Sequence, residues 1–551
     1  MRRTWIVVVL VVATVASAAG YQRVGPWKEF RYASARLMAD LNKPDALIRT
    51  QSLAKLPHDL LKAPIAKEVL TEDLAFYYEQ HEDRRGLNGS IKRIAYEHKV
   101  DWTDRILATA LDEPAEVALW RDGKGALRHF AIVMQQRTLA KVLREAAVVA
   151  LKDQQLTLAG EIEIGAAAVK VYALAINPRR TLLLIASGDR MVVLSDPGLL
   201  FDKGNKVTPD ARAAIAEWLT DDGALIRRFA LAQSKPADVA QPIHTLVIGA
   251  PTLTLGYAAL LSGFKGLRFD FGARWSTYAW IDPQGLPQGR LGDAAVWRAA
   301  PANPSACMLL PVDWRAAKTV VAEAEKKPEL PSDKTLDALD GVALACWYAD
   351  SSLYSPVFIA RLANDAGDRN AALKAVATWA IASPKVEGGE ATSEKPGGML
   401  KEETFDKQTI WRAVGANASD GEPQRSATPT VAARGEYIVF SPDGALVDLA
   451  LDTLAHKNPS VVDQMPVSDA TLGVVTPHRL SAMAERESYA ALSGSGDENL
   501  LAAVRAHLPA RMKALAAYPP YRLELAPKEE AQDGWRRVEW RTPKERGSER
   551  K

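Results

Sequence analysis

The second half of this chain repeats the sequence plan of its first half, and this repeat limits the folds open to it. The run VALW at 117–120 precedes a strand-like segment and then an amphipathic helix expected at 137–153. The run VALACW at 342–347 opens the same series again, with its helix expected at 369–381. In both helices the apolar residues recur at the spacing of one buried stripe. The chain is therefore predicted to hold two like units.

A turn containing serine, aspartate and proline closes the matching part of each copy. The serines of Ser195-Asp196-Pro197 and Ser441-Pro442-Asp443 lie 246 residues apart (441 − 195), against 225 for the valines (342 − 117). An insertion of 21 residues (246 − 225) in the second copy accounts for the difference. Repeated active-site loops are one reading of these turns. Ser and Asp at a strand end more simply cap the next helix, and Pro suits its first turn, so we interpret them as caps.

Tight hairpins in the first copy indicate antiparallel strands. Gly188-Asp189 joins strand candidates at 181–187 and 190–194 through a two-residue link that contains glycine. With the helical stripes, this predicts an α+β fold of two tandem repeats, each an antiparallel sheet packed by helices, after a helical N-terminal region. The expected organisation is a signal peptide or short membrane anchor at 1–20, a mostly helical region at 27–115, a first α+β repeat with an aromatic-rich segment at 116–300, a second repeat at 301–515 and a charged tail at 516–551.

The composition is that of a globular protein without a charge bias. Of the 551 residues, 48% are hydrophobic and 25% are charged, which excludes general disorder, and the net charge is +2. No nucleic-acid partner is expected, because this composition supplies no electrostatic footprint for one. Basic residues do gather at 536–551, but glutamates are interleaved with them, which is typical of a solvated tail.

The N-terminus carries the pattern of an export signal. Arg2 and Arg3 precede an apolar run at 5–16, followed by Ala16-Ser17-Ala18, which fits the small-x-small rule for cleavage after Ala18. Left uncleaved, residues 5–20 make a stretch of 16 (20 − 5 + 1), just short of the roughly 17–25 that span a bilayer. We expect export, with cleavage and retention as a short anchor both open. The expected location is the periplasm, or the inner membrane facing the periplasm.

The chain has two cysteines, Cys307 and Cys346. In an exported protein such a pair can form a disulfide. Each cysteine lies in an apolar strand-like run, so the two could be neighbours in one sheet. Two separate buried thiols are the open alternative. Neither cysteine has a CxxC partner or a nearby histidine, so no metal site is expected here.

Ser52 and Lys55 are the one nameable catalytic pair. They match the SxxK pattern of the serine acyl-enzymes of the cell wall, in which one helical turn places the lysine beside the serine as its base. The supporting motifs are missing, because Ser468-Asp469 is followed by Ala470 and no Lys-Thr-Gly occurs. We therefore expect no catalytic site. If the chain has one, Ser52 and Lys55 are the candidates.

No cofactor is expected either. The eight histidines are scattered, with no pair at the i,i+4 spacing of a helical metal site. Phosphate-binding and dinucleotide-binding glycine motifs are absent from the sequence, as is HExxH. The segment 244–301 is rich in aromatic residues, including Phe264, Phe271 and Trp297. Such residues more often form core, but they could also line a groove for a hydrophobic ligand.

Four segments carry a family resemblance: PAEVALW at 114–120, LRFDF at 267–271, CMLLPVDW at 307–314 and YIVFS at 437–441. Together they resemble an uncharacterised bacterial family of large exported proteins whose genes accompany a bacterial alpha-2-macroglobulin-like protein. That family has no established activity or catalytic residues, so the resemblance assigns none to this chain. It implies an envelope role, in support of a protease-trapping or surface-defence system.

Three functions follow from these observations. The first is a non-enzymatic binding or accessory protein of an alpha-2-macroglobulin-like periplasmic system, with another envelope protein as partner. The second is an envelope serine hydrolase of the SxxK type, and the third is a carrier of a hydrophobic ligand. Export, the repeat and the lack of a complete catalytic constellation favour the first. Nothing in the sequence indicates the oligomeric state or the identity of the partner.

Overall fold

The computed structural model describes residues 39–56, 59, 112–121, 127–135, 156–165, 167–177, 180–202, 204–229, 242–253, 263–272, 274–281, 294–312, 339–353, 355–362, 399–405, 408–414, 429–493, 498–526 and 534–542. The chain divides into two compact units. The first comprises 1–252 with 268–276, and the second comprises 253–267 with 277–551. The strand β9 (Phe264–Phe271) is shared between them.

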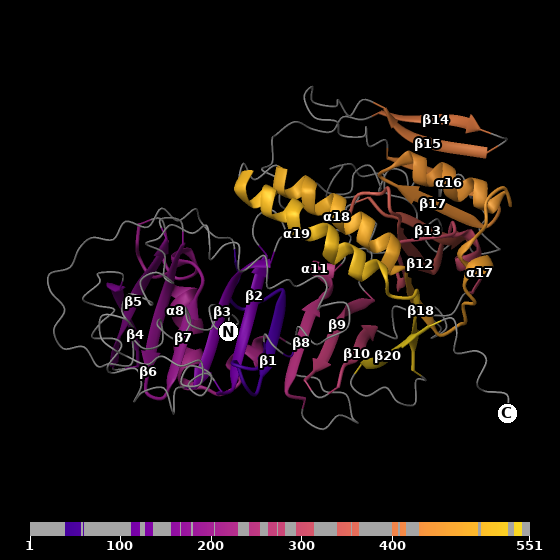
Figure 1. Ribbon diagram of the computed structural model, residues 1–551. Coiled ribbons are helices and arrows are strands. Elements are labelled where there is room, and N and C mark those ends of the chain that lie inside the picture. The colour runs from indigo at the N-terminus through magenta and orange to yellow at the C-terminus, as the bar shows by residue number, and fades with distance from the viewer. Residues whose placement is uncertain are drawn as a thin grey trace, which may run out of the picture. The chain divides into compact units, whose positions relative to one another are not determined.

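The first unit is built around an antiparallel sheet with the strand order β4–β5–β6–β7–β3–β2–β1–β8 (Figure 1). Its strands are β4 (Leu156–Ile164), β5 (Ala167–Asn177), β6 (Arg180–Ser187), β7 (Arg190–Leu194), β3 (Leu127–Gln135), β2 (Ala115–Arg121), β1 (Ala46–Thr50) and β8 (His244–Gly249). Its helices are η1 (Pro197–Leu199), α8 (Pro209–Thr220), α9 (Ala224–Arg228) and α11 (Ala250–Leu253). The α8 residues Ala211, Ala214, Ile215 and Trp218 are buried at helical spacing, and α8 packs on β7 and β4.

The second unit has an antiparallel sheet with the order β14–β15–β16–β17–β13–β12–β11–β18–β19–β20–β10. Its strands are β14 (Met399–Phe405), β15 (Gln408–Val414), β16 (Thr430–Arg434), β17 (Tyr437–Ser441), β13 (Val357–Leu362), β12 (Leu339–Trp347), β11 (Ala306–Pro311), β18 (Thr471–Val475), β19 (Tyr521–Leu525), β20 (Trp535–Arg541) and β10 (Ser276–Ile281). Its helices are α12 (Ala294–Ala299), α16 (Gly444–Leu454), α17 (Val461–Gln464), α18 (Pro477–Ser493) and α19 (Glu498–Ala516). Helices α12 and α16 pack on strands of this sheet, and α18 pairs with α19.

The two sheets share one strand order. Adding ten to each strand number of β4–β5–β6–β7–β3–β2–β1–β8 gives the first eight strands of the second sheet, which continues with β19, β20 and β10. Backbone hydrogen bonds give the residue equivalence: Asp45 N–H donates to the carbonyl of Leu119 over 2.9 Å, and Ser305 N–H donates to that of Trp347 over 2.7 Å. Asp45 thus corresponds to Ser305, and Leu119 to Trp347.

This equivalence differs from the one that the sequence suggests. Val117 lies two residues before Leu119, so it corresponds to Ala345, two residues before Trp347. The alignment of Val117 with Val342 is therefore wrong by three residues. The cause is that VALW and VALACW share letters, whereas the pairing register of each strand is fixed by its neighbours in the sheet.

Local turn and cap signals correspond to the observed structure. Gly188 and Gly435 open the two-residue turns β6–β7 and β16–β17, with φ of 60° and 59°, the left-handed region that glycine adopts without strain. The carboxylate of Asp196 accepts a hydrogen bond from Gly198 N–H (2.7 Å), and that of Asp443 accepts one from Ala445 N–H (3.0 Å). The interpretation of both turns as helix caps is confirmed.

The predicted fold class is wrong. We expected helix-packed α+β repeats after a helical N-terminal region, but the described residues form mostly antiparallel sheet. Within the region 27–115, β1 is a strand that pairs with β2 on one side and β8 on the other. A strand of five residues with partners far away in the sequence leaves no local periodicity for a prediction to use. The helices expected at 137–153 and 369–381 lie outside the described residues.

The segment expected to be a charged tail, 516–551, also contains sheet. Its strands β19 and β20 pair with each other, and β20 pairs with β10. Trp535 and Val538 of β20 are buried at 1% and 4% exposure, whereas Arg537 and Arg541 are exposed. The interleaved Arg and Glu residues at 536–541 thus belong to a strand.

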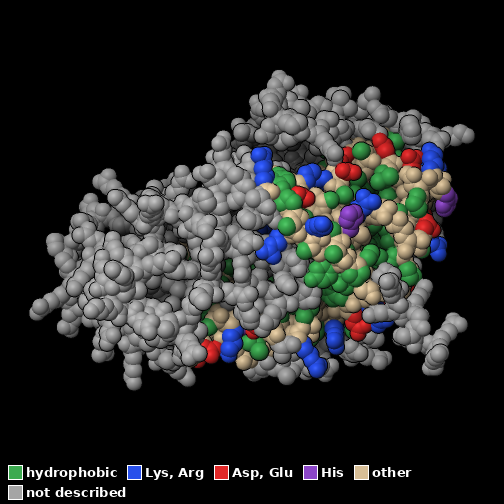
Figure 2. Space-filling view, in the orientation of Figure 1, with side chains coloured by type: hydrophobic (Ala, Val, Ile, Leu, Met, Phe, Trp, Pro, Cys, Tyr) green, Lys and Arg blue, Asp and Glu red, His purple; other side chains and the backbone are tan. Residues whose placement is uncertain are grey.

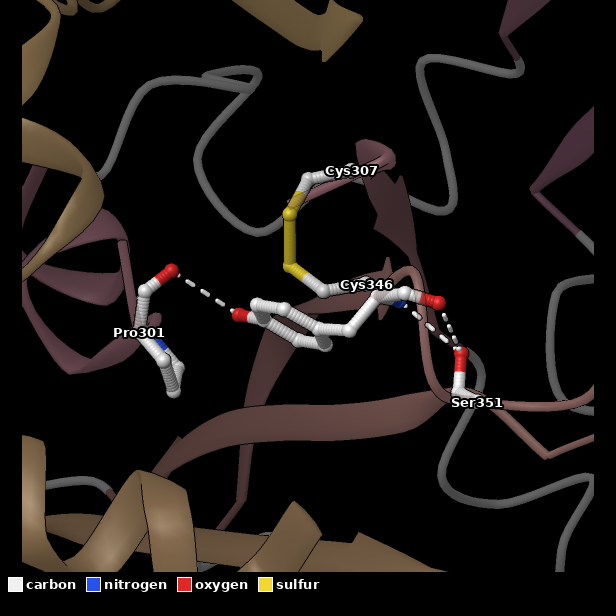
Figure 3. Close-up of a disulfide and its surroundings, with 5 residues drawn as sticks. Pro301, Cys307, Cys346 and Ser351 are labelled. Atoms are coloured by element: carbon white, nitrogen blue, oxygen red, sulfur yellow. Dashed lines mark hydrogen bonds between the residues drawn. A yellow bond between two sulfur atoms is a disulfide. The ribbon is translucent and has the colours of Figure 1, made fainter. Parts of the chain in front are cut away.

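Cys307 and Cys346 form a disulfide in the second unit (Figure 3). They are direct partners across β11 and β12, and both are fully buried. Tyr348 follows two residues after Cys346. Its hydroxyl donates to the carbonyl of Pro301 (2.9 Å), and its backbone exchanges hydrogen bonds with the Ser351 hydroxyl (2.9 Å each). Complete burial raises the pKa of Tyr348 well above its usual value, so the phenol stays protonated as this donor.

Candidate functional site

Ser52 and Lys55 lie just after β1 in the first unit, where they hold a turn. The Ser52 hydroxyl oxygen accepts a hydrogen bond from Lys55 backbone N–H (3.2 Å), as a helix cap does. The Lys55 ammonium lies 3.4 Å from the Asp112 carboxylate, and the two side chains are 60% and 46% exposed. A hydrogen bond from Ser52 is the main cause that lowers the pKa of Asp112. Both side chains are therefore directed to Asp112, and this geometry gives no support to a serine–lysine catalytic pair.

A buried chain of three polar side chains lies beside this turn. The His244 ring is fully buried, with Nδ1 at 2.8 Å from the Thr50 hydroxyl and Nε2 at 3.1 Å from the Asp59 carboxylate. Burial lowers the pKa of His244, while the hydrogen bond and charge of Asp59 oppose that shift. A neutral ring next to a carboxylate carries its proton on Nε2, so Nδ1 accepts from Thr50. Phe271 covers the ring at a centroid distance of 4.9 Å.

Thr50, His244 and Asp59 follow the order of nucleophile, base and orienting acid in hydrolases. The Thr50 side chain, however, is almost completely buried, at 2% exposure for the residue. Its hydroxyl oxygen also accepts from Ser52 N–H (3.0 Å), and its one proton is shared between the Ser52 carbonyl (2.8 Å) and His244 Nδ1 (2.8 Å). Three hydrogen-bonding partners occupy the one atom that would attack a substrate. The chain is therefore a structural lock that ties β1 and β8 to the turn at Asp59.

A pocket of about 340 Å³, lined by both polar and apolar residues, opens at one end of the central strands of the same sheet. Antiparallel neighbours bring four strand termini together there: the ends of β1 and β3 and the starts of β2 and β7. The turn between α8 and α9 closes the pocket. Its lining comprises Arg49, Thr50, Pro114, Ala115, Glu116, Val133, Met134, Gln135, Arg190, Asp222 and Gly223.

Glu116 is the perturbed carboxylate of this pocket. Burial raises its pKa above the ordinary value, against the opposing charges of Arg49, Arg190 and Arg227 and a hydrogen bond from Ile226 N–H. Arg49 is its direct cross-strand partner in the β1–β2 ladder, which places the two side chains next to each other on one face. The pocket thus presents a partly desolvated carboxylate beside an exposed guanidinium.

Arg190 is held in place on the other side of the pocket. Its guanidinium pairs with the Asp222 carboxylate and donates to the carbonyl of Trp218 at the end of α8 (3.2 Å). The Gln135 amide lies 3.4 Å from the same Asp222 carboxylate. The Arg190 side chain is only 10% exposed. This network fixes the turn between α8 and α9 against β3 and β7.

Sequence reasoning missed the pocket and the lock. Thr50 and His244 lie 194 residues apart, and His244 and Asp59 lie 185 apart, so no motif joins them. One signal was available for the pocket, because Glu116 stands between the buried residues Ala115 and Val117 in an apolar strand. A carboxylate in such a run is a candidate for a functional site, since its burial is costly unless it is paired.

The aromatic-rich segment supplies core residues. Phe264, Phe271, Tyr278 and Trp297 are at most 5% exposed, so they form no open groove for a hydrophobic ligand. Among the residues that the structure describes, no group of His, Cys, Asp and Glu could hold a metal ion. No described helix combines the length and apolar character that crossing a bilayer requires.

Figure 2 shows one face of the molecule. On the described part of this face, Lys and Arg side chains are scattered among hydrophobic and polar ones and form no single basic patch. This agrees with the balanced charge of the chain.

The fold and the pocket together define the class of protein. It has two units, each built on an antiparallel sheet, the two sheets share the order of eight strands, and the first unit contains the pocket. A family model described as "Uncharacterized protein conserved in bacteria (DUF2138)" matches residues 4–540, and the chain belongs to this family. It is 30% identical over 508 residues to the "Uncharacterized protein YfaA" of Escherichia coli (strain K12), covering 89% of this chain and 88% of that protein. No solved structure matches the chain.

Proposed function

We propose that this protein is an exported, non-enzymatic binding protein of the bacterial envelope, with the polar pocket of its first unit as a ligand site. The pocket carries the proposal. It is concave, it combines apolar walls with a few charged groups, and one of those groups is a carboxylate of raised pKa. These are the properties of ligand sites in proteins. The hydroxyl of Thr50, a residue of the pocket lining, and the imidazole of His244 are buried and hydrogen-bonded to each other.

The disulfide supports the location. Cys307 and Cys346 face each other on adjacent strands and are joined. Disulfides persist in oxidising compartments such as the periplasm and are rare in the cytosol. The apolar N-terminal run after Arg2 and Arg3 supports the same location, as a cleaved leader or a short anchor.

The partner we propose is an envelope protein of an alpha-2-macroglobulin-like system, which the family resemblance implies. In this view the protein is an accessory of a protease-trapping complex. Support for a non-catalytic role comes from Ser52 and Lys55, whose side chains are both directed to Asp112.

A thiol assay in cells tests the location. Full-length protein in its bacterial host is trapped with N-ethylmaleimide, and the cysteines that remain protected are then reduced and labelled with a maleimide of high mass. We expect no trapped thiol in the full-length chain and two in a control lacking residues 1–20. Two free thiols in the full-length chain would refute export.

Crosslinking tests the partner. Envelopes that contain the tagged full-length chain are crosslinked, and the captured proteins are compared with those from cells that express the chain lacking residues 1–20. An alpha-2-macroglobulin-like protein enriched by the full-length chain alone is the expected result. Equal recovery of every captured protein from both strains would contradict a specific envelope partner.

A further inference from the structure

The shared strand order makes the second unit an internal reference for the pocket. Counted from the equivalent residues Asp45 and Ser305, Arg49 corresponds to Leu309, since each lies four residues further on. Counted back three residues from Leu119 and Trp347, Glu116 corresponds to Leu344. Arg49 and Glu116 are direct cross-strand partners, and Leu309 and Leu344 are direct cross-strand partners too. The charged residues Arg49 and Glu116 of the first unit thus stand where the second unit has a leucine pair.

The leucine pair shows what this position contributes to the fold. Leu309 and Leu344 are both fully buried, so in the second unit the position belongs to the hydrophobic core. In the first unit the same position holds two charges beside a cavity, and burial already raises the pKa of Glu116. Arg49 is exposed, and a charged pair with one exposed member adds little to folding stability. The charged pair can therefore serve a purpose other than holding the sheet together.

The charges that line the pocket balance. Arg49 and Arg190 contribute two positive charges, and Glu116 and Asp222 contribute two negative ones, so the sum is zero (2 − 2). Arg190 and Asp222 pair with each other. A ligand with one net charge would leave one charge uncompensated in a partly desolvated pocket, whereas a ligand with one positive and one negative group would not.

We propose that the pocket binds a small zwitterion, with an ammonium group at Glu116, a carboxylate at Arg49 and a short apolar body against Val133 and Met134. This inference rests on the proposed role of the pocket as a ligand site. A guanidinium can bind a carboxylate through two parallel hydrogen bonds, and a carboxylate accepts hydrogen bonds from an ammonium. A volume of about 340 Å³ suits a free amino acid or a dipeptide. A free amino acid and a dipeptide each carry one ammonium and one carboxylate group, and titration with each of them distinguishes the two.

Isothermal titration of the purified full-length chain tests the proposal. The probes are L-leucine and L-leucyl-L-leucine, with N-acetyl-L-leucine and L-leucinamide as analogues that each lack one charge. We expect at least one unblocked probe to bind, and both blocked analogues to bind at least tenfold more weakly. Tighter binding of L-leucine points to a free amino acid, and tighter binding of L-leucyl-L-leucine points to a peptide. No binding by either unblocked probe, or equal binding by the blocked analogues, overturns the proposal.

Matched variants assign the binding to this pocket. Glu116→Gln keeps the size of the side chain and removes its charge, Arg49→Gln removes the charge with a shorter polar side chain, and we expect each to weaken binding at least tenfold. Arg212→Gln, at an exposed position of α8 outside the pocket lining, is the control and should bind as the wild type does. Unchanged binding in Glu116→Gln overturns the proposal.

The two proposals fail in different ways. If neither probe binds while the cellular thiol assay finds Cys307 and Cys346 joined, the ligand class is wrong and the envelope location stands. If both cysteines are free thiols in the full-length chain in cells, export is wrong whatever the pocket binds.

Discussion

Removal of the disulfide should destabilise the second unit by an amount set by its loop. Cys307 and Cys346 are 39 residues apart, and cross-linking a loop of that length removes chain entropy from the unfolded state equivalent to roughly 4 kcal/mol at 25 °C. The variant is Cys307→Ala/Cys346→Ala, because both sites are fully buried and alanine introduces no polar group there. With a urea slope of roughly 3 kcal/mol per molar, the unfolding midpoint should fall by about 1.3 M.

The assay is urea unfolding followed by hydrogen exchange and mass spectrometry, which reports each segment separately. Peptides covering β12 and β13 should show the full shift, and peptides covering β5 and β6 of the first unit should shift less. Each single variant, Cys307→Ala or Cys346→Ala, opens the same loop and should therefore lose nearly as much as the double variant. If each single variant loses only half of the double-variant effect, the loss comes from packing and the loop argument is refuted.

Two other predictions concern buried contacts. Burial lowers the pKa of His244 in the folded state, so the unfolded chain binds a proton more readily below its usual pKa of about 6.5. The contribution of His244 to the free energy of unfolding is thus present above about pH 6.5 and is lost on acidification. Thermal unfolding should therefore occur at a lower temperature at pH 5.5 than at pH 7.5. The variant His244→Gln should flatten this dependence, and an identical slope in both proteins would contradict it. Gly473→Ala would place a Cβ 2.8 Å from the backbone carbonyl of Cys307 and should cost roughly 2 kcal/mol in urea unfolding. The control Gly160→Ala meets only ordinary contacts at 3.5 Å, and an equal effect of both substitutions would refute the steric reasoning.

Local features of this fold could be predicted from the sequence because their causes are local. The turn at Gly188 needs a residue that tolerates positive φ, and glycine supplies it. Asp196 and Asp443 cap the backbone two residues ahead, within reach of any aspartate at a strand end. Such signals require only a few neighbouring residues to be recognised.

The strand order could not be predicted in the same way. The five residues of β1 are held between β2 and β8, whose sequences begin at Ala115 and His244. Nothing in the sequence around β1 identifies either partner. The equivalence of Leu119 and Trp347 likewise depends on pairing register, which shared letters at Val117 and Val342 misplaced by three residues.

The pocket could be predicted only in part. Glu116 inside an apolar strand was a visible anomaly, and its neighbour in the ladder is Arg49. Arg190 and Asp222 come to the same place from β7 and from the turn after α8, through the fold alone. Ser52 and Lys55 matched a known pattern by spacing, but side-chain direction decides chemistry, and both are directed to Asp112.

The central claim is that the charged pair of the first unit serves a ligand and not the fold. The double variant Arg49→Leu/Glu116→Leu tests it directly, because it gives the first unit the residues that the second unit has at these positions. Its thermal unfolding is measured with and without L-leucine or L-leucyl-L-leucine, whichever the wild type binds. We predict an unfolding temperature without ligand close to that of the wild type, because a charged pair with one exposed member adds little to stability, and no rise when the ligand is added. A variant that unfolds several degrees lower without ligand, or that the ligand still stabilises, would contradict the claim.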